Sequence, residues 1–234
     1  SSDLPKYVLS RSIARELRVN GIATVKYDSL FPVTPKFGEL LRYQEKLAKD
    51  KSIYSNRLKP FLIEYWQPGG EVDLENPFVK LALAPETLEV VSHYLGCWPR
   101  LFDYRLWETK VMTPGQAEIY SQSWHRDPED KKLLNMFIYL NDVDGGTGPF
   151  TYVKGSHIEG KYWKTFPQVL PPNASYPPKG AVERTIPPQD IKICTAPRGT
   201  IIFADTAGLH KGGYSTNTPR LMSKALYITD GNFR

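Results

Sequence analysis

The second half of the chain consists of short apolar segments separated by turn-forming residues. Seven runs rich in aromatic and β-branched side chains follow one another after residue 98, at positions 100–112, 117–124, 133–140, 149–153, 190–196, 199–205 and 220–229. Turn-forming sequences such as TPGQ, DVDGGTGP, APRG and STNTP lie between them. Runs of this length without long helices between them predict an antiparallel sandwich or jelly roll.

The first 97 residues have a different pattern. Apolar residues recur at helical spacing over 10–21, 36–50 and 85–96, while the segment 23–31 is typical of a short strand. Glycines stand at two of the expected helix ends, where a left-handed residue commonly stops a helix. We therefore expect one domain over residues 1–234, mainly β with flanking α, with a helix-rich part (1–97) and a jelly-roll core (98–234).

A proline-rich stretch interrupts the strand pattern. Residues 158–190 hold seven of the chain's 20 prolines and show no clear period. A loop of this length inside a domain is usually a functional segment such as a lid, or else disordered. The aromatic residues Tyr162, Trp163 and Tyr176 favour a lid.

Charge and cysteine content restrict the class of protein. The net charge is +5, but basic and acidic residues are mixed, so a small anionic or polar ligand is favoured over nucleic acid. Cys97 and Cys194 form no CxxC motif, which suits a reducing compartment. The sequence has no apolar run of the roughly 20 residues that span a bilayer, and its first residues lack a signal-peptide pattern. These features predict a cytoplasmic protein that is not embedded in a membrane.

A His-x-Asp triplet follows the second of the expected strands. His125 and Asp127 would point to the same face of an extended segment, although such a triplet alone is more often an ordinary loop pair. His210 follows much later, and together the three supply the two-histidine, one-carboxylate set that leaves open positions on Fe(II). Arg220, ten residues further on, could bind a carboxylate through two hydrogen bonds.

These residues resemble a known family. His125, Asp127, His210 and Arg220, together with the stretch 137–157, are similar to the Fe(II)/2-oxoglutarate dioxygenases of the phytanoyl-CoA dioxygenase family. The resemblance implies a double-stranded β-helix core and Fe(II) held by the two histidines and the aspartate as catalytic centre. It also implies 2-oxoglutarate anchored by the arginine, O2 as cosubstrate, and release of succinate and CO2.

The sequence departs from the family pattern at two places. Lys154 stands where the family usually has proline, before a Gly-Ser-His corner whose histidine, His157, is expected to be structural. Gly212 replaces a serine whose hydroxyl often assists the arginine. Thr216 or Thr218 could supply that hydroxyl instead, or none does.

Strand alternation suggests further cavity residues. Ser121 and Ser123 would share the face of the first histidine, and the family places an aromatic residue that packs on 2-oxoglutarate at Phe137. Asn135 shares the face of that phenylalanine and would line the barrel with Tyr139, while 136, 138 and 140 would face the helices. On the first strand of the core, Tyr104 or Lys110 would reach the cosubstrate. His93, on an expected helix, is interpreted as a surface or packed residue.

The expected activity is hydroxylation of a small polar metabolite or natural-product intermediate. Asp127 argues against halogenation, because a halogenase of this family has a small residue there and leaves a coordination position open for chloride. Two alternatives remain: a cupin-type metal-dependent isomerase or hydrolase, and a jelly roll that binds a ligand without catalysis. Neither needs Arg220 in addition to the three metal ligands. The oligomeric state is left open.

Overall fold

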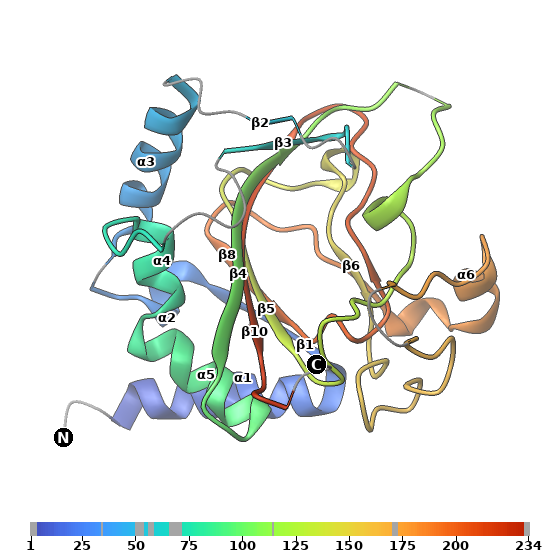
Figure 1. Ribbon diagram of the computed structural model, residues 1–234, viewed down its shortest axis with the longest axis horizontal. Helices are drawn as coiled ribbons and strands as arrows, with labels where there is room; N and C mark the ends of the chain where they lie inside the picture. The colour runs from blue at the N-terminus through green and yellow to red at the C-terminus, as the bar shows by residue number, and fades with distance from the viewer. Residues whose placement is uncertain are drawn as a thin grey trace.

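Two antiparallel β-sheets form the body of the protein (Figure 1). The computed structural model describes residues 4–33, 35–49, 54–55, 59–65, 72–113, 115–169 and 173–231. The larger sheet has seven strands in the order β1-β8-β5-β10-β4-β3-β2, and the smaller has the order β7-β6-β9. The strands are β1 (Ile22–Lys26), β2 (Tyr54–Ser55), β3 (Leu62–Glu64), β4 (Arg100–Thr109), β5 (Leu134–Tyr139), β6 (Thr151–Val153), β7 (Ile191–Ile193), β8 (Thr200–Ala204), β9 (His210–Lys211) and β10 (Arg220–Ile228). The predicted jelly-roll core is confirmed.

Helices cover one face of the larger sheet (Figure 1). They are α1 (Leu4–Asn20), α2 (Tyr27–Leu30), α3 (Phe37–Lys49), α4 (Pro77–Ala82) and α5 (Pro85–Leu95), with α6 (Ala181–Thr185) on the opposite side of the molecule. The three helices predicted from periodicity are present. Gly96 ends α5 with φ +79°, a left-handed conformation that favours glycine. Within the described ranges, no helix combines the length and apolar character needed to cross a membrane.

Two of the expected strands differ in the structure. The segment 23–31 is a strand only as far as Lys26, because its partner strand β8 begins at Thr200, which pairs with Lys26. The chain then turns into α2, whose first backbone N–H, that of Tyr27, donates to Gly199 O at 2.7 Å. The segment 117–124 is not a strand. It contains a 3₁₀ turn, Tyr120–Gln122, in which the Gln122 side chain accepts a hydrogen bond from the backbone of Ile119.

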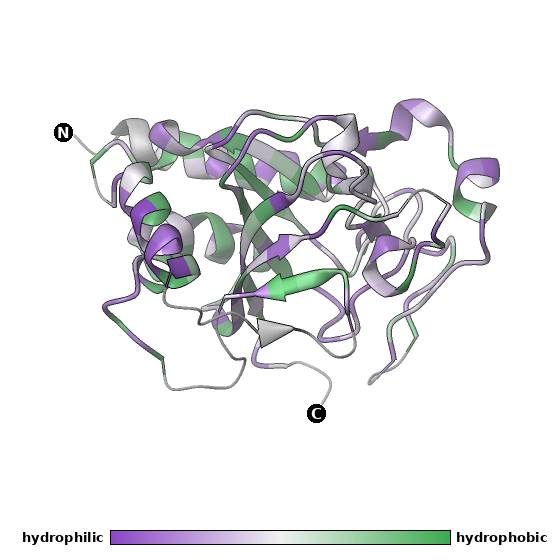
Figure 2. Cartoon of the chain, turned by 90° about the horizontal axis from the view of Figure 1, so that it is seen from above, coloured by the Kyte–Doolittle hydropathy of each residue, from purple (hydrophilic) through white to green (hydrophobic). Residues whose placement is uncertain are grey.

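The two faces of the larger sheet contribute to two separate cores. Met136 and Ile138 on β5 pack against the helices, whereas Phe137 and Tyr139 point inward, toward the smaller sheet. Figure 2 shows hydrophobic residues concentrated on the strands at the centre of the molecule. The predicted alternation of β5 is therefore present, and Asn135 is a fully buried polar residue on its inner face.

The described parts of the proline-rich segment 158–190 lie along the side of the barrel that is opposite to α1–α5 (Figure 1). In its described parts it contains α6 and a 3₁₀ turn, Pro188–Asp190. Trp124 donates to Glu183 at 2.6 Å, and Gln168 donates to the carbonyl of Asp127 at 2.6 Å. Within the segment, Tyr162 donates to Asp190 at 2.7 Å. We call this segment the strap, because side-chain hydrogen bonds fix it to the barrel at several points along its length.

The other two histidines are placed as predicted. His157 is buried, and its Nε2 lies 3.0 Å from the carbonyl oxygen of Arg18, which ties the corner after β6 to the end of α1. His93 is half-buried on α5, with Nε2 3.5 Å from Glu89. Neither lies among the cavity residues described below.

Candidate metal centre and cavity

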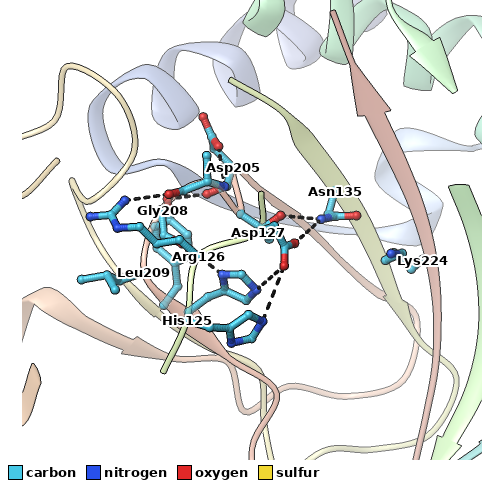
Figure 3. Close-up of polar contacts among 12 residues, drawn as sticks. His125, Arg126, Asp127, Asn135, Asp205, Gly208, Leu209 and Lys224 are labelled. Atoms are coloured by element: carbon cyan, nitrogen blue, oxygen red, sulfur yellow. Dashed lines mark hydrogen bonds and ion pairs between the residues drawn. The ribbon is translucent and has the colours of Figure 1, made fainter. Parts of the chain in front are cut away.

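His125, Asp127 and His210 meet at one point inside the barrel. Each offers one ligand atom, and these atoms all lie within 4.8 Å of one another. The Nε2 atoms of His125 and His210 are 3.5 Å and 3.7 Å from Asp127 Oδ1. Figure 3 shows the side chains of His125 and Asp127 converging. The structure therefore brings together all three residues that the sequence singled out as metal ligands.

Local backbone pairing sets this geometry. His125 N donates to His210 O at 2.9 Å and His210 N donates to His125 O at 3.0 Å, so the two residues form a hydrogen-bonded antiparallel pair. The Nδ1 atom of His125 lies 2.9 Å from Ser123 O, and that of His210 lies 3.0 Å from Gly208 O. A backbone carbonyl can only accept, so each Nδ1 carries the proton and each Nε2 presents a lone pair.

The protonation states suit a metal site. Burial and the neighbouring His210 lower the pKa of His125 to about 3, and burial lowers the pKa of His210. Burial alone would raise the pKa of Asp127, but the nearby His210 and His125 hold it below its ordinary value. At neutral pH the three groups are two neutral imidazoles and one carboxylate, the forms that bind metal ions.

Asp127 is held in place by Thr206 and Gln168, which the sequence did not single out, and by Asn135, which was predicted to line the barrel. Its backbone N–H donates to Thr206 O at 2.8 Å, and Gln168 of the strap donates to its carbonyl at 2.6 Å. Asn135 Nδ2 donates to Thr206 Oγ1 at 2.6 Å and lies 3.5 Å from Asp127 Oδ2 (Figure 3). Asn135 is thus a neighbour of the aspartate carboxylate, and its Oδ1 has no hydrogen-bond partner among the described residues.

Arg126 lies between the two ligands in sequence and points away from them (Figure 3). Its buried guanidinium lies within hydrogen-bond distance of six backbone carbonyls, which share its five N–H groups: those of Ser156, Tyr162, Trp163, Thr165, Phe166 and Ala207. Five of these belong to the strap and the corner before it, and Ala207 precedes the metal ligand His210. Because side chains alternate along an extended segment, the His-x-Asp triplet would have predicted that Arg126 points away from the metal site. Nothing in the sequence indicates which carbonyls it contacts.

A cavity of about 340 Å³ opens beside the three ligands. Its walls come from the inner faces of β3, β4, β5 and β10 and from the segments around the ligands. The lining residues are Lys59, Phe61, Leu62, Glu64, Asp103, Arg105, Trp107, Ser121, His125, Asp127, Glu129, Asn135, Phe137, Phe150, His210, Gly212, Arg220, Met222 and Lys224. This volume is at the small end of the range for ligand sites, about 300–1,000 Å³.

Arg220 lies at one end of this cavity. Its side chain is 3% exposed on β10, and burial lowers its pKa. It donates to Gly148 O, and its Nη2 lies 3.4 Å from the hydroxyl of Thr109. Within the described part of the chain, its Nε has no hydrogen-bond partner. The guanidinium therefore retains hydrogen-bonding capacity toward the cavity.

The structure corrects several expectations around Arg220. The hydroxyl beside the guanidinium is that of Thr109, whereas Thr216 Oγ1 lies 3.3 Å from Gly146 O. The contact recorded for Thr218 involves its backbone carbonyl, which accepts a hydrogen bond from the Ser215 hydroxyl. Gly212 approaches the backbone closely: a Cβ there would lie 3.0 Å from Ser121 O, which already accepts the Gly212 N–H at 2.7 Å.

Tyr104 and Lys110 are not at the cavity. On β4 the lining residues are Asp103, Arg105 and Trp107, so Tyr104 lies on the opposite face and the expected register was wrong by one residue. Lys110 follows the end of β4 and donates to Pro60 O at 3.0 Å.

The residues expected to share a face with His125 are divided. Ser121 lines the cavity, whereas Ser123 contributes its carbonyl to His125 and is not among the lining residues, because this segment is not a strand. Phe137 lines the cavity as predicted, with its ring 4.9 Å from that of Phe150.

Charged side chains crowd the other end of the cavity. Three acidic and three basic residues line it there: Lys59, Glu64, Asp103, Arg105, Glu129 and Lys224. Arg105 pairs with Asp103 at 2.8 Å and with Glu64 at 3.0 Å, and Lys224 pairs with Asp103 at 2.9 Å. Burial and the nearby Asp127 raise the pKa of Glu129 to about 7.

Part of the strap also reaches the metal centre. Ser175 forms an isolated antiparallel bridge with Arg126, and the next residue, Tyr176, stacks on His125 with ring centroids 5.7 Å apart. The predicted lid residue Tyr176 therefore covers one face of His125, a candidate metal ligand. The ring of Trp163 is instead under the ammonium of Lys164, on the outer side of the strap.

Comparison with known proteins identifies the fold. No protein-family model matches the chain, and no curated protein matches it in sequence. Solved structures do match it, among them the epimerase SnoN in complex with Fe3+, alpha ketoglutarate and nogalamycin RO. That match has a TM-score of 0.67 at 19% identity and covers 94% of this chain and 84% of SnoN.

Two further structures are similar over most of the chain. The non-heme alpha ketoglutarate dependent carbocyclase SnoK from nogalamycin biosynthesis matches with a TM-score of 0.65 at 15% identity, covering 97% of this chain and 87% of SnoK. EctD from S. alaskensis, solved with 2-oxoglutarate and 5-hydroxyectoine, matches with a TM-score of 0.62 at 19% identity. This match covers 94% of this chain and 76% of EctD. The chain thus has the jelly-roll fold of these three proteins.

Proposed function

We propose that the protein is an Fe(II)- and 2-oxoglutarate-dependent oxygenase that hydroxylates a small polar molecule and releases succinate and CO2. The observation that carries this proposal is the arrangement of four side chains in one cavity. His125, Asp127 and His210 present a metal-binding donor set, and Arg220 offers a buried guanidinium with spare donors at the same cavity. The fold shared with SnoN, SnoK and EctD supports the same conclusion.

The donor set fits Fe(II). Two imidazole nitrogens and one carboxylate oxygen suit this ion, and three protein ligands leave coordination positions for a cosubstrate and O2. Both imidazoles are oriented by backbone carbonyls, which fixes the nitrogen that faces the metal. When bound there, Fe(II) supplies the O2-dependent oxidation, with 2-oxoglutarate as the co-reductant.

The remaining cavity residues would bind and shield the cosubstrate. Arg220 would hold the distal carboxylate of 2-oxoglutarate through two charge-assisted hydrogen bonds, which are strong in a buried site. The Thr109 hydroxyl orients the guanidinium. Phe137, Phe150 and Met222 line the space between that arginine and the ligands, and their apolar surfaces exclude water from it.

Asp127 favours hydroxylation over halogenation, because its carboxylate occupies the coordination position that a halide would need. The alternatives are a cupin-type isomerase or hydrolase that uses zinc or manganese, and a binding protein without catalysis. Neither requires a buried arginine with unused donors facing the cavity. SnoN is an epimerase and SnoK a carbocyclase, so product analysis is part of the test.

Two of the sequence interpretations remain predictions. Membership of the phytanoyl-CoA dioxygenase family rests on the motif resemblance, and a cytoplasmic location rests on the cysteine pattern and the composition. The proposed cavity chemistry depends on neither.

The test is formation of succinate from 2-oxoglutarate. Fe(II)-loaded protein is incubated with 2-oxoglutarate, O2 and a panel of small polar metabolites, and succinate and oxygenated products are followed by mass spectrometry. We expect at least one metabolite to stimulate succinate formation and to gain one oxygen atom. Turnover that needs zinc or manganese and proceeds without 2-oxoglutarate would support the isomerase or hydrolase instead.

A further inference from the structure

The charged end of the cavity contains one acidic side chain that differs from the others. Glu64 and Asp103 each accept hydrogen bonds from Arg105, and Asp103 also binds Lys224. Glu129 Oε2 is buried and has no hydrogen-bond partner among the described residues. A buried carboxyl oxygen without a hydrogen-bond partner is unfavourable, because nothing replaces the water that burial removes from it. This cost points to a ligand that supplies the donor.

The position of Glu129 relative to the metal centre is set by the chain. It follows the ligand Asp127 by two residues, and both line the same cavity. On β10, Arg220 and Lys224 face this cavity four residues apart, which corresponds to roughly 13 Å along a strand. The arginine end and the charged end are thus separate, with the metal ligands reachable from both. A molecule at the charged end would have its reacting carbon near the metal without displacing the cosubstrate.

We propose that the substrate carries a compact cationic group, most simply a primary amine, which Glu129 binds. This inference rests on the proposed function, because it concerns the substrate of the same site. An ammonium offers three donors and fits beside a carboxylate in a small cavity. The group would occupy the unpartnered Oε2 and place the attached carbon skeleton toward His125 and Asp127.

Other substrate classes fit this end of the cavity less well. The basic side chains there are already bound: Arg105 by Glu64 and Asp103, and Lys224 by Asp103, while Lys59 also has interactions of its own. An anionic group would meet basic side chains whose charge Glu64 and Asp103 already balance, and the nearby Glu129 carboxylate would repel it. An apolar molecule would remove six charged side chains from water without replacing their hydrogen bonds, which is unfavourable.

The experiment compares three probes of similar shape and different charge: n-butylammonium, 1-butanol and n-butyrate. Their binding to the protein, with and without Fe(II) and 2-oxoglutarate under anaerobic conditions, is followed by saturation-transfer NMR and by titration calorimetry. We expect n-butylammonium to bind at least about tenfold more tightly than either of the others, since a charge-assisted hydrogen bond is worth that much or more.

Substitutions then assign the preference to one side chain. Glu129→Gln removes the charge at nearly constant shape, and we expect it to abolish the preference for n-butylammonium. Glu129→Asp keeps the charge and should retain part of the preference. Glu16→Gln, on the exposed side of α1, is the matched control and should change nothing. Circular dichroism confirms that each variant is folded, and the aspartate variant provides the test if the glutamine variant is not.

The outcomes separate this inference from the proposed function. A preference for n-butylammonium that survives Glu129→Gln, or a preference for n-butyrate in the unaltered protein, would overturn the inference. If the protein binds Fe(II) and 2-oxoglutarate and shows no preference among the probes, the inference fails alone. If it shows the Glu129-dependent preference and does not bind Fe(II) and 2-oxoglutarate, the proposed function fails alone.

Discussion

Arg126 and Arg220 are two buried arginines on opposite sides of the metal ligands, and their surroundings differ. Arg126 is 2% exposed, and its five N–H groups are shared among six backbone carbonyls. Arg220 is 3% exposed, yet it contacts one carbonyl and one hydroxyl, and its Nε has no partner within the described ranges. A buried guanidinium whose donors are all used stabilises the fold. One with donors left unused is prepared for a ligand.

The same contrast extends to the regions around the two arginines. Behind the ligands, Asp205 accepts from Tyr94 at 2.6 Å and from the Ala207 N–H at 3.0 Å, and Tyr152 donates to its carbonyl at 2.8 Å. On the cavity side, Glu129 Oε2, Asn135 Oδ1 and Arg220 Nε lack partners in the described structure. The hydrogen bonds around Asp205 hold the metal-ligating residues in place. The cavity walls keep polar groups available for binding.

The largest effect should come from Arg126. Arg126→Met removes the five N–H groups that the six carbonyls share, and we expect the free energy of unfolding to fall by about 3–5 kcal/mol. Urea denaturation followed by circular dichroism measures it. Arg184→Met, at an exposed position on α6 of the strap, is the control and should have little effect. If the two variants were equally stable, Arg126 would not be a structural residue.

The buried Asp205 should make stability depend on pH. Burial raises its pKa to about 7, so the folded state binds a proton that the unfolded state has already released. This contribution is present below the ordinary pKa of aspartate and is lost as pH rises through about 7. Between about pH 5 and pH 8 we expect the contribution of Asp205 to the free energy of unfolding to fall by on the order of 2–3 kcal/mol. Denaturation of Asp205→Asn should show a clearly smaller decline, and an equal decline would contradict the assignment.

Arg220 should affect binding more than stability. Arg220→Met is expected to weaken 2-oxoglutarate binding about 10- to 100-fold, because charge-assisted hydrogen bonds contribute about 1.5–3 kcal/mol. Its free energy of unfolding should change by less than about 1.5 kcal/mol, since few internal hydrogen bonds are lost. Anaerobic titration calorimetry and urea denaturation give the two values. A large loss of stability without loss of affinity would make Arg220 equivalent to Arg126.

The smallest effect should come from Thr109. Thr109→Val removes the hydroxyl beside the Arg220 guanidinium and keeps the shape of the side chain. We expect 2-oxoglutarate binding to weaken several-fold, in line with about 0.5–1.5 kcal/mol for one neutral hydrogen bond. Thr216→Val is the matched control, because Thr216 bonds Gly146 and not the arginine. If Thr216→Val weakened binding more than Thr109→Val, the geometry around Arg220 would be wrong.

The sequence predicted the parts of the site that depend on side-chain chemistry and strand alternation. His125, Asp127, His210 and Arg220 converge, and β5 directs Phe137 inward, as expected. These predictions succeeded because ligand types and a period of two are visible in the sequence. The jelly-roll core followed from the spacing of short strands.

The parts that depend on register or on backbone partners were not predictable. Polar and apolar residues share both faces of β4, so nothing in the sequence showed that Arg105 rather than Tyr104 faces the cavity. The partners of Arg126 are backbone carbonyls, which have no sequence signature. The segment 117–124 has the residue pattern of a strand. In the structure, however, the Gln122 side chain accepts a hydrogen bond from the Ile119 N–H, and a 3₁₀ turn forms instead.

The central claim is that one cavity binds Fe(II) through His125, Asp127 and His210 and binds 2-oxoglutarate beside it through Arg220. The most direct measurement is an anaerobic titration with Fe(II), with and without 2-oxoglutarate, followed by visible absorption. We expect a metal-to-ligand charge-transfer band only when both are present. It should be absent in His125→Ala and should require far more 2-oxoglutarate in Arg220→Met. The absence of a band in the unaltered protein, or an unchanged band in both variants, would contradict the claim.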